Sequence, residues 1–258
     1  KLPSAFLLSG PGVKGKTYKD FPKISFFPRD ASVRSDITPS EDDWPFLFLP
    51  RRELPMTYVW PIFLIIFVGF LPLYKEIRKT DDAAIDSLMF CLGMGFMLLE
   101  VRSMSELSLL FGSTWLVNSV IIAAVMLFIL LSNYIASKLS TKWTPVLTMI
   151  LLAVLVLSAF VKASSLAAFG PVGGSVLGCL VFLLPLIFSS AIFSLMFKTS
   201  KSVNRSLAFN LVGGLVGVCL EYLSMVFGIK ALTYIAIAIY LVVLYLTKKA
   251  VARSVVGS

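Results

Sequence analysis

Histidine is absent from this 258-residue chain, and charged residues make up only 14% of it. The lack of histidine removes the commonest general base and the commonest ligand of transition metals and haem. The only three cysteines are Cys91, Cys179 and Cys219, and each falls within an apolar run, where a thiol behaves as a small hydrophobic group. They predict neither a disulfide framework nor a metal cage. We therefore expect no metal site, no cofactor and no catalytic residue in this chain.

Hydrophobic residues make up 58% of the chain, and its mean hydropathy is +0.91. A soluble domain of this length would carry more polar surface. Apolar runs follow one another at about the length of a membrane crossing, since a hydrocarbon core of ~30 Å needs ~20 helical residues. Lipid offers no hydrogen bonds to the backbone, so such runs fold as helices. Seven spans are predicted, at Tyr58–Tyr74, Ala83–Val101, Trp115–Ala136, Pro145–Val161, Val176–Phe197, Leu207–Phe227 and Ala231–Leu246.

The predicted fold class is therefore an all-α membrane protein with two parts. Residues 56–258 form a bundle of about seven transmembrane helices. Residues 1–55 form a short, partly extended extramembrane segment, which is polar, rich in proline and holds candidate strands at Ala5–Leu8 and Ile24–Phe27. A segment this small with so little apolar content does not build a stable core by itself. We interpret it as a linker and the remnant of a soluble domain.

Residues Gly10–Thr17 match the pattern of a phosphate-binding P-loop. A working P-loop lies between a strand and a helix whose N-terminus faces the phosphates. The segment that follows contains Pro22 and Pro28 and has no apolar stripe of helical period. We interpret the motif as a basic, glycine-rich loop and not as a nucleotide site.

Three acidic residues, Glu41, Asp42 and Asp43, precede Trp44 and an apolar piece that leads into the first span. We interpret this segment as an interfacial anchor with a solvated acidic turn. The carboxylates alone do not predict a metal site, because no second cluster of ligands stands nearby.

The net charge is +9, and the basic residues gather at the ends of the predicted spans. No face interleaves basic and aromatic residues, so nucleic acid is not an expected partner. With seven spans, one end of the bundle carries most of the loop lysines, including Lys138, Lys198 and Lys248; we name it the basic end. The opposite end, where residues 43–55 lead into the first span, is the entry end. The positive-inside rule places the basic end and the C-terminus in the cytoplasm, with the N-terminal segment outside.

Ionisable side chains inside a membrane are costly and are usually paired or functional. Glu100, Arg102, Asn118 and Glu221 are predicted at a similar height near the entry end, since a helix rises ~1.5 Å per residue. We predict that they form one buried polar layer in which Arg102 pairs with Glu221 or Glu100. Glu106, four residues after Arg102, lies on the same helix face and is another possible partner, although this order of charges is the weaker one. Two interpretations stay open: a structural contact between helices, or a pocket for a ligand, an ion or a proton.

The span that carries Glu221 also carries small residues at helical spacing. Gly213 and Gly217 are four residues apart and so lie on one face of the helix. This small-residue spacing allows two helices to approach closely in a membrane. We predict a helix-packing contact at these two glycines.

Several runs resemble spermidine-synthase-like bacterial membrane proteins: Glu100–Arg102, Leu109–Thr114, Asn118–Val120 and Glu221–Ser224 match their membrane segments, and Asp42–Phe46 matches the linker before them. In that family a polytopic membrane region is fused to a domain with an S-adenosylmethionine-binding-type fold. The sequence holds no glycine-rich nucleotide loop followed by a helix. No aminopropyl- or methyl-transfer residue is therefore carried over, and such a domain is expected upstream of Lys1.

The leading functional expectation is a non-catalytic membrane domain of this family, which anchors a soluble domain or scaffolds a larger complex. Its partners are the lipid bilayer and other membrane protein subunits. One alternative is a transporter or small-ligand-binding membrane protein that uses the polar layer, although the first and last three spans show no inverted repeat. Another is the membrane part of an aminopropyl- or methyltransferase.

Overall fold

The computed structural model describes residues 43–46, 49, 51–77, 83–112, 114–161, 165–166 and 168–256. The P-loop-like motif and the candidate strands lie outside the described residues. Two short helices accompany the long ones: η2 (Thr141–Trp143) precedes α4, and α8 (Ser224–Phe227) lies between α7 and α9. Within the described residues the long helices are α1 (Met56–Ile77), α2 (Ala83–Phe111), α3 (Trp115–Lys138), α4 (Thr144–Ala159), α6 (Gly170–Phe197), α7 (Val203–Glu221) and α9 (Ile229–Val256). The predicted all-α fold is confirmed.

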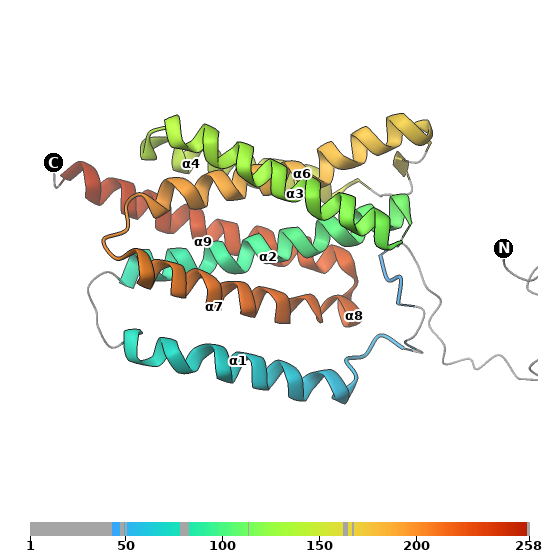
Figure 1. Ribbon diagram of the computed structural model, residues 1–258, viewed down its shortest axis with the longest axis horizontal. Coiled ribbons are helices and arrows are strands. Elements are labelled where there is room, and N and C mark those ends of the chain that lie inside the picture. The colour runs from blue at the N-terminus through green and yellow to red at the C-terminus, as the bar shows by residue number, and fades with distance from the viewer. Residues whose placement is uncertain are drawn as a thin grey trace, which may run out of the picture. The chain divides into compact units, whose positions relative to one another are not determined.

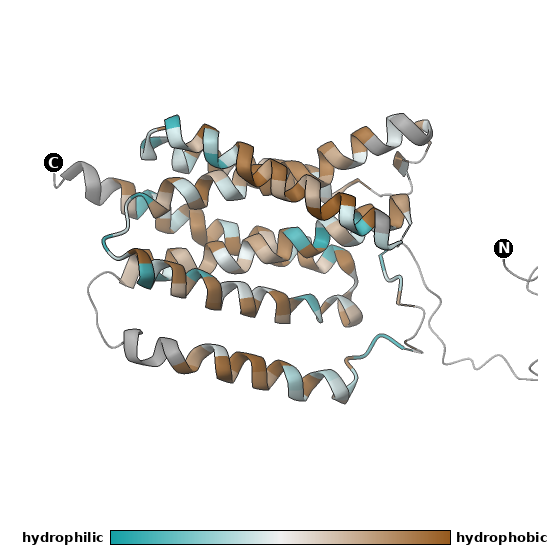
Figure 2. Cartoon of the chain, in the orientation of Figure 1, coloured by the Kyte–Doolittle hydropathy of each residue, from teal (hydrophilic) through white to brown (hydrophobic). Residues whose placement is uncertain are grey.

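Six helices in this part of the chain are long and apolar enough to cross a membrane, and α1 adds a shorter apolar stretch at Met56–Leu71. Residues 51–55 and the end of α9 lie at opposite ends of the bundle, as seven crossings require (Figure 1). Hydrophobic residues dominate the middle of the helices, whereas hydrophilic residues gather at the turns and in one stretch of α2 toward the entry end (Figure 2). On α1, Trp60, Phe63 and Phe67 are 75%, 65% and 64% exposed, as expected of a helix that faces lipid. The chain is a multi-pass membrane protein.

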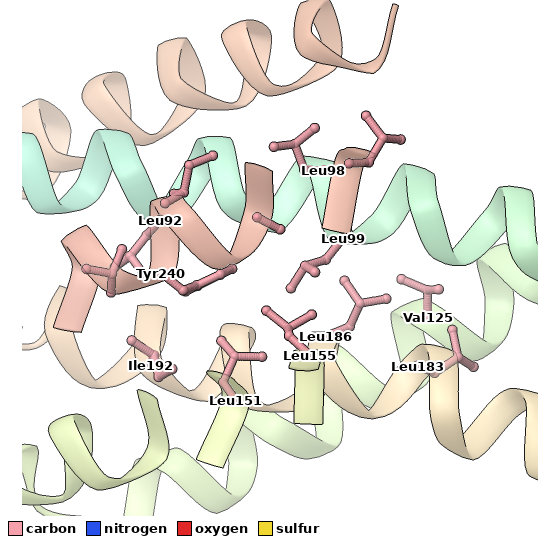
Figure 3. Packing of buried hydrophobic residues seen from close by; sticks show 14 of the residues in the cluster. Leu92, Leu98, Leu99, Val125, Leu151, Leu155, Leu183, Leu186, Ile192 and Tyr240 are labelled. Atoms are coloured by element: carbon pink, nitrogen blue, oxygen red, sulfur yellow. The ribbon is translucent and has the colours of Figure 1, made fainter. Parts of the chain in front are cut away.

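Helix α2 is the centre of the bundle, because it contacts α7, α9, α6 and α3. Its apolar residues are spread around the helix axis and are not confined to one stripe, which is typical of a surrounded helix. Its buried leucines, such as Leu92 and Leu99, meet side chains from α4, α6 and α9 (Figure 3). The one buried tyrosine of this core, Tyr240 on α9, has its hydroxyl 2.5 Å from Ser189 Oγ, so its polar atom is paired.

Several helix boundaries differ from the predicted spans, and α9 continues past Leu246 to Val256. Helix α2 continues past Val101 to Phe111, because its polar residues find partners inside the protein and do not have to leave the membrane. Helix α6 begins at Gly170, with Pro171 in its first turn, where the missing N–H costs no helical hydrogen bond. The span predicted to end at Phe227 is interrupted after Glu221, and the short α8 follows.

Candidate functional site

The segment before α1 is fixed to the turn between α8 and α9. Trp44 is fully buried, and its Nε1 donates to the carbonyl oxygen of Met225 at 2.6 Å. The N–H of Ile229 donates to the carbonyl oxygen of Asp43 at 2.8 Å, and that of Lys230 to its Oδ1 at 2.7 Å. Asp43 thus satisfies two N–H groups that the first turn of α9 leaves unbonded, and its negative charge suits the helix N-terminus. We name residues 43–46, together with these contacts, the clamp.

Gly228 is required at this turn for two reasons. Its φ is +89°, a conformation that side chains rarely adopt. A Cβ at this position would also lie 2.7 Å from Asp43 Oδ2. Two expectations for the segment are therefore corrected: Trp44 is a buried anchor and not an interfacial one, and Asp43 is a helix cap and not a solvated acid.

Helices α2 and α7 run parallel and touch through their backbones. A Cβ at Gly213 would collide with the carbonyl group of Phe90, and one at Gly217 would lie 2.6 Å from the carbonyl oxygen of Met94. Gly93 makes the reciprocal contact from α2, because a Cβ added there would collide with the backbone of α7. Gly213 and Gly217 thus lie in a close helix contact, whose partner the spacing alone did not name.

A buried ion pair that the sequence reasoning missed joins the same two helices at the basic end. Arg205 donates from Nε at 2.9 Å and from Nη2 at 2.5 Å to Asp86 Oδ2. The two side chains are only 12% and 7% exposed. Asp86 lies in the first turn of α2, and Arg205 lies near the start of α7. Opposite charges at the same end of two adjacent spans were the available signal.

A cavity of about 640 Å³ lies at the entry end, between the ends of α2 and α7, the start of α3 and the clamp. Ser108 Oγ donates to Asn118 Oδ1 at 3.2 Å across this space. Two residues of the predicted layer, Asn118 and Glu221, line the cavity, whereas Glu100 and Arg102 are not among its lining residues. The described lining consists of Pro45, Phe46, Val101, Met104, Ser105, Ser108, Leu109, Asn118, Glu221, Ser224 and Ile229.

Arg102 lies on another side of α2, so its predicted pairing is corrected. The guanidinium is 3% exposed, and it donates from Nη1 to Ser158 Oγ at 3.0 Å and from Nη2 to the Ser158 carbonyl oxygen at 3.2 Å. It also lies over the ring of Phe182, 5.7 Å from the ring centre. Ser158 is in the last turn of α4, where carbonyl groups lack helical partners and attract positive charge.

The charge that faces Arg102 is Glu106, which attracts it electrostatically from one helical turn away and is 7% exposed. Residues four apart share a helix face, whereas Glu100, two residues before Arg102, points about 200° away around the axis. The predicted ion pair with Glu100 or Glu221 is therefore replaced by an electrostatic contact within α2.

This correction makes a stability prediction. Glu106→Gln is expected to lower the free energy of unfolding by about 1–3 kcal/mol, because it removes the negative charge that attracts the buried Arg102 guanidinium. Glu221→Gln is expected to change it by less, because Arg102 does not depend on it. Denaturant unfolding in detergent micelles measures both. A larger loss of stability in Glu221→Gln than in Glu106→Gln would support the original prediction that Arg102 pairs with Glu221.

Among the described residues, no three histidine, cysteine, aspartate or glutamate side chains gather in a group that could hold a metal ion. Comparison with protein-family models, with curated proteins and with solved structures finds no match for this chain.

Proposed function

We propose that this chain is a membrane domain that anchors a soluble domain, the role implied by its resemblance to spermidine-synthase-like membrane proteins. The observation that supports the proposal is the clamp. Trp44 and Asp43 tie the chain to the α8–α9 turn just before it enters the membrane. A domain that precedes residue 43 would then be joined to the bundle next to a fixed point. Such an attachment serves an anchor or scaffold better than a passive tether would.

We further propose that the entry end faces outward from a bacterial inner membrane. The basic end carries Lys138, Lys142, Lys198 and Lys201, whereas the described part of the entry end carries Arg51, Arg52 and Lys230. Short loops rich in lysine and arginine stay in the cytoplasm. The distribution of charge therefore supports a cytoplasmic C-terminus.

One proteolysis experiment tests both statements. Arg51 and Arg52 are exposed next to the clamp and are trypsin sites. In right-side-out membrane vesicles, Trp44→Ala is expected to speed cleavage at these sites several-fold, because the unanchored segment samples conformations that a protease accepts. Trp60→Ala is the matched control, since Trp60 is 75% exposed and makes no comparable contact.

Equal cleavage rates in the wild type and Trp44→Ala would contradict the anchoring role of the clamp. Protection of Arg51 and Arg52 in right-side-out vesicles, with cleavage only in inverted ones, would reverse the orientation.

A second candidate function, a membrane protein that binds or transports a small ligand, is favoured by the cavity at the entry end. Its polar groups converge from several helices, and its size is within the range of small-molecule sites, ~300–1,000 Å³. To serve this function, the cavity must bind a ligand of a particular chemical class.

A further inference from the structure

The cavity at the entry end contains one charged group among its described lining residues, and that group is Glu221. Within the part of the chain that the structure describes, its carboxylate forms no hydrogen bond or ion pair with another residue. The other polar groups of the lining are neutral: the Asn118 amide and the hydroxyls of Ser105, Ser108 and Ser224. The electrostatic character of the cavity is therefore that of a single carboxylate, which favours a positively charged occupant.

The depth of the cavity indicates where the occupant comes from. Ser108 lies in the last turn of α2, and Asn118 lies in the first turn of α3. Helix α2 has 29 residues, so at ~1.5 Å per residue it is longer than a hydrocarbon core of ~30 Å. Its last turn thus reaches the level of the lipid headgroups. An occupant can arrive there from water or from the membrane surface.

The walls of the cavity indicate the shape of the occupant. Phe46, Met104 and Leu109 supply apolar surface beside the polar groups. A volume of about 640 Å³ is far larger than a single ion or water molecule needs. The combination of an apolar wall and one carboxylate suits an amphipathic cation better than a bare metal ion.

We infer that this cavity binds the ammonium group of an amphipathic ligand, with Glu221 as its counter-charge. The Asn118 carbonyl oxygen and the serine hydroxyls accept the remaining ammonium protons, and the apolar wall holds the carbon chain. The inference rests on the second candidate function and not on the anchoring role. An aminated lipid headgroup and a soluble amine share this chemistry, so both are tested.

The experiment uses the full chain and two probes, each with a neutral counterpart. Hexylammonium is compared with 1-hexanol in detergent. Nanodiscs that contain phosphatidylethanolamine are compared with nanodiscs that contain the same lipid with its amine acetylated. Thermal unfolding and titration calorimetry measure binding to the wild type, to Glu221→Gln and to Glu100→Gln. Glu100 is the matched control. It is also a partly buried carboxylate, but it lies on α2 and does not line the cavity.

The wild type is expected to be stabilised by at least one of the two charged probes and by neither neutral counterpart. Glu221→Gln is expected to weaken binding about tenfold or more, the effect of losing one charge-assisted hydrogen bond, whereas Glu100→Gln binds as the wild type does. A response to the lipid alone identifies a headgroup, and a response to hexylammonium alone identifies a soluble amine.

Three results would overturn the inference: no stabilisation by either charged probe, an equal response to a neutral counterpart, or equal weakening in Glu221→Gln and Glu100→Gln. If Glu221→Gln does not fold, Glu221→Asp is tested in its place, because it keeps the negative charge. If Glu221→Asp no longer prefers the charged probe over its neutral counterpart, that result counts against the site. The anchoring role is tested separately, by trypsin cleavage at Arg51 and Arg52. Glu221→Gln is expected to leave that cleavage unchanged, so failure of the ligand site and failure of the anchoring role are distinguishable.

Discussion

Gly213→Ala is expected to prevent most of the protein from folding in the membrane. The added Cβ would collide with the carbonyl group of Phe90, which is backbone and cannot rotate away as a side chain can. Relief requires α2 and α7 to move apart, and α2 also contacts α9, α6 and α3. Overpacking costs about 1–3 kcal/mol and occasionally more, and a collision with backbone is expected at the upper end of that range. The folded yield by size-exclusion chromatography and the midpoint of thermal unfolding measure the loss.

Two other glycines provide matched controls for this substitution. A Cβ at Gly173 of α6 would meet only Phe169 Cβ, at the ordinary distance of 3.5 Å, so Gly173→Ala is expected to be neutral or to stabilise by up to ~1 kcal/mol through helix propensity. A Cβ at Gly214 would lie 3.2 Å from Met97 Cγ, and that flexible side chain can yield. Gly214→Ala is therefore expected to be intermediate. If all three variants unfold at the same temperature, the backbone contact does not hold the two helices together.

The close contact at Gly213 shows what the sequence could predict. Spacing by four placed Gly213 and Gly217 on one face, and small residues on one face predict a neighbouring helix. The identity of that neighbour depends on how the spans are arranged around one another. Hydropathy does not encode this arrangement, because apolar residues are spread around the axis of α2 and mark no single contact face. The reciprocal glycine, Gly93, sits in a separate span with no spacing that links it to α7.

The polar layer was predicted from height along each helix, and height does not give the direction in which a side chain points. A rise of ~1.5 Å per residue placed Glu100, Arg102, Asn118 and Glu221 near one level. Around the helix axis, successive residues turn by about 100°, so two polar residues at one height can face different neighbours. Asn118 and Glu221 meet at the cavity, whereas Arg102 faces Ser158 on α4. The i, i+4 relation of Arg102 and Glu106 was the available local signal for the contact within α2, but the prediction favoured Glu221 or Glu100.

The clamp and the Asp86–Arg205 pair have no periodic signal at all. Trp44 and Met225 are 181 residues apart in sequence, and Asp86 and Arg205 are 119 apart. Each contact joins residues that lie far apart in the sequence and meet only in the folded bundle. Only the charge and the position of each residue at a span end hinted at the ion pair.

Asp86→Asn is expected to lower the free energy of unfolding by about 1–3 kcal/mol, because the hydrogen bonds from the largely buried Arg205 guanidinium lose their charged acceptor. Arg205→Gln is expected to cost a similar amount by leaving Asp86 unpaired. Lys201→Gln is the matched control: it removes one positive charge from the same end of the bundle, but the Lys201 side chain is exposed. Denaturant unfolding in micelles measures all three variants.

The double variant Asp86→Asn with Arg205→Gln separates the ion pair from the two side chains. Neither residue then leaves a buried charge behind, so the double variant is expected to lose less stability than the sum of the two single losses, with a coupling of about 1–3 kcal/mol. The pair also fixes the register of α2 against α7, since it lies on the same parallel contact as Gly213 and Gly217. Losses that simply add would mean that each side chain is held by other contacts, and the parallel register would then rest on the glycine contact alone.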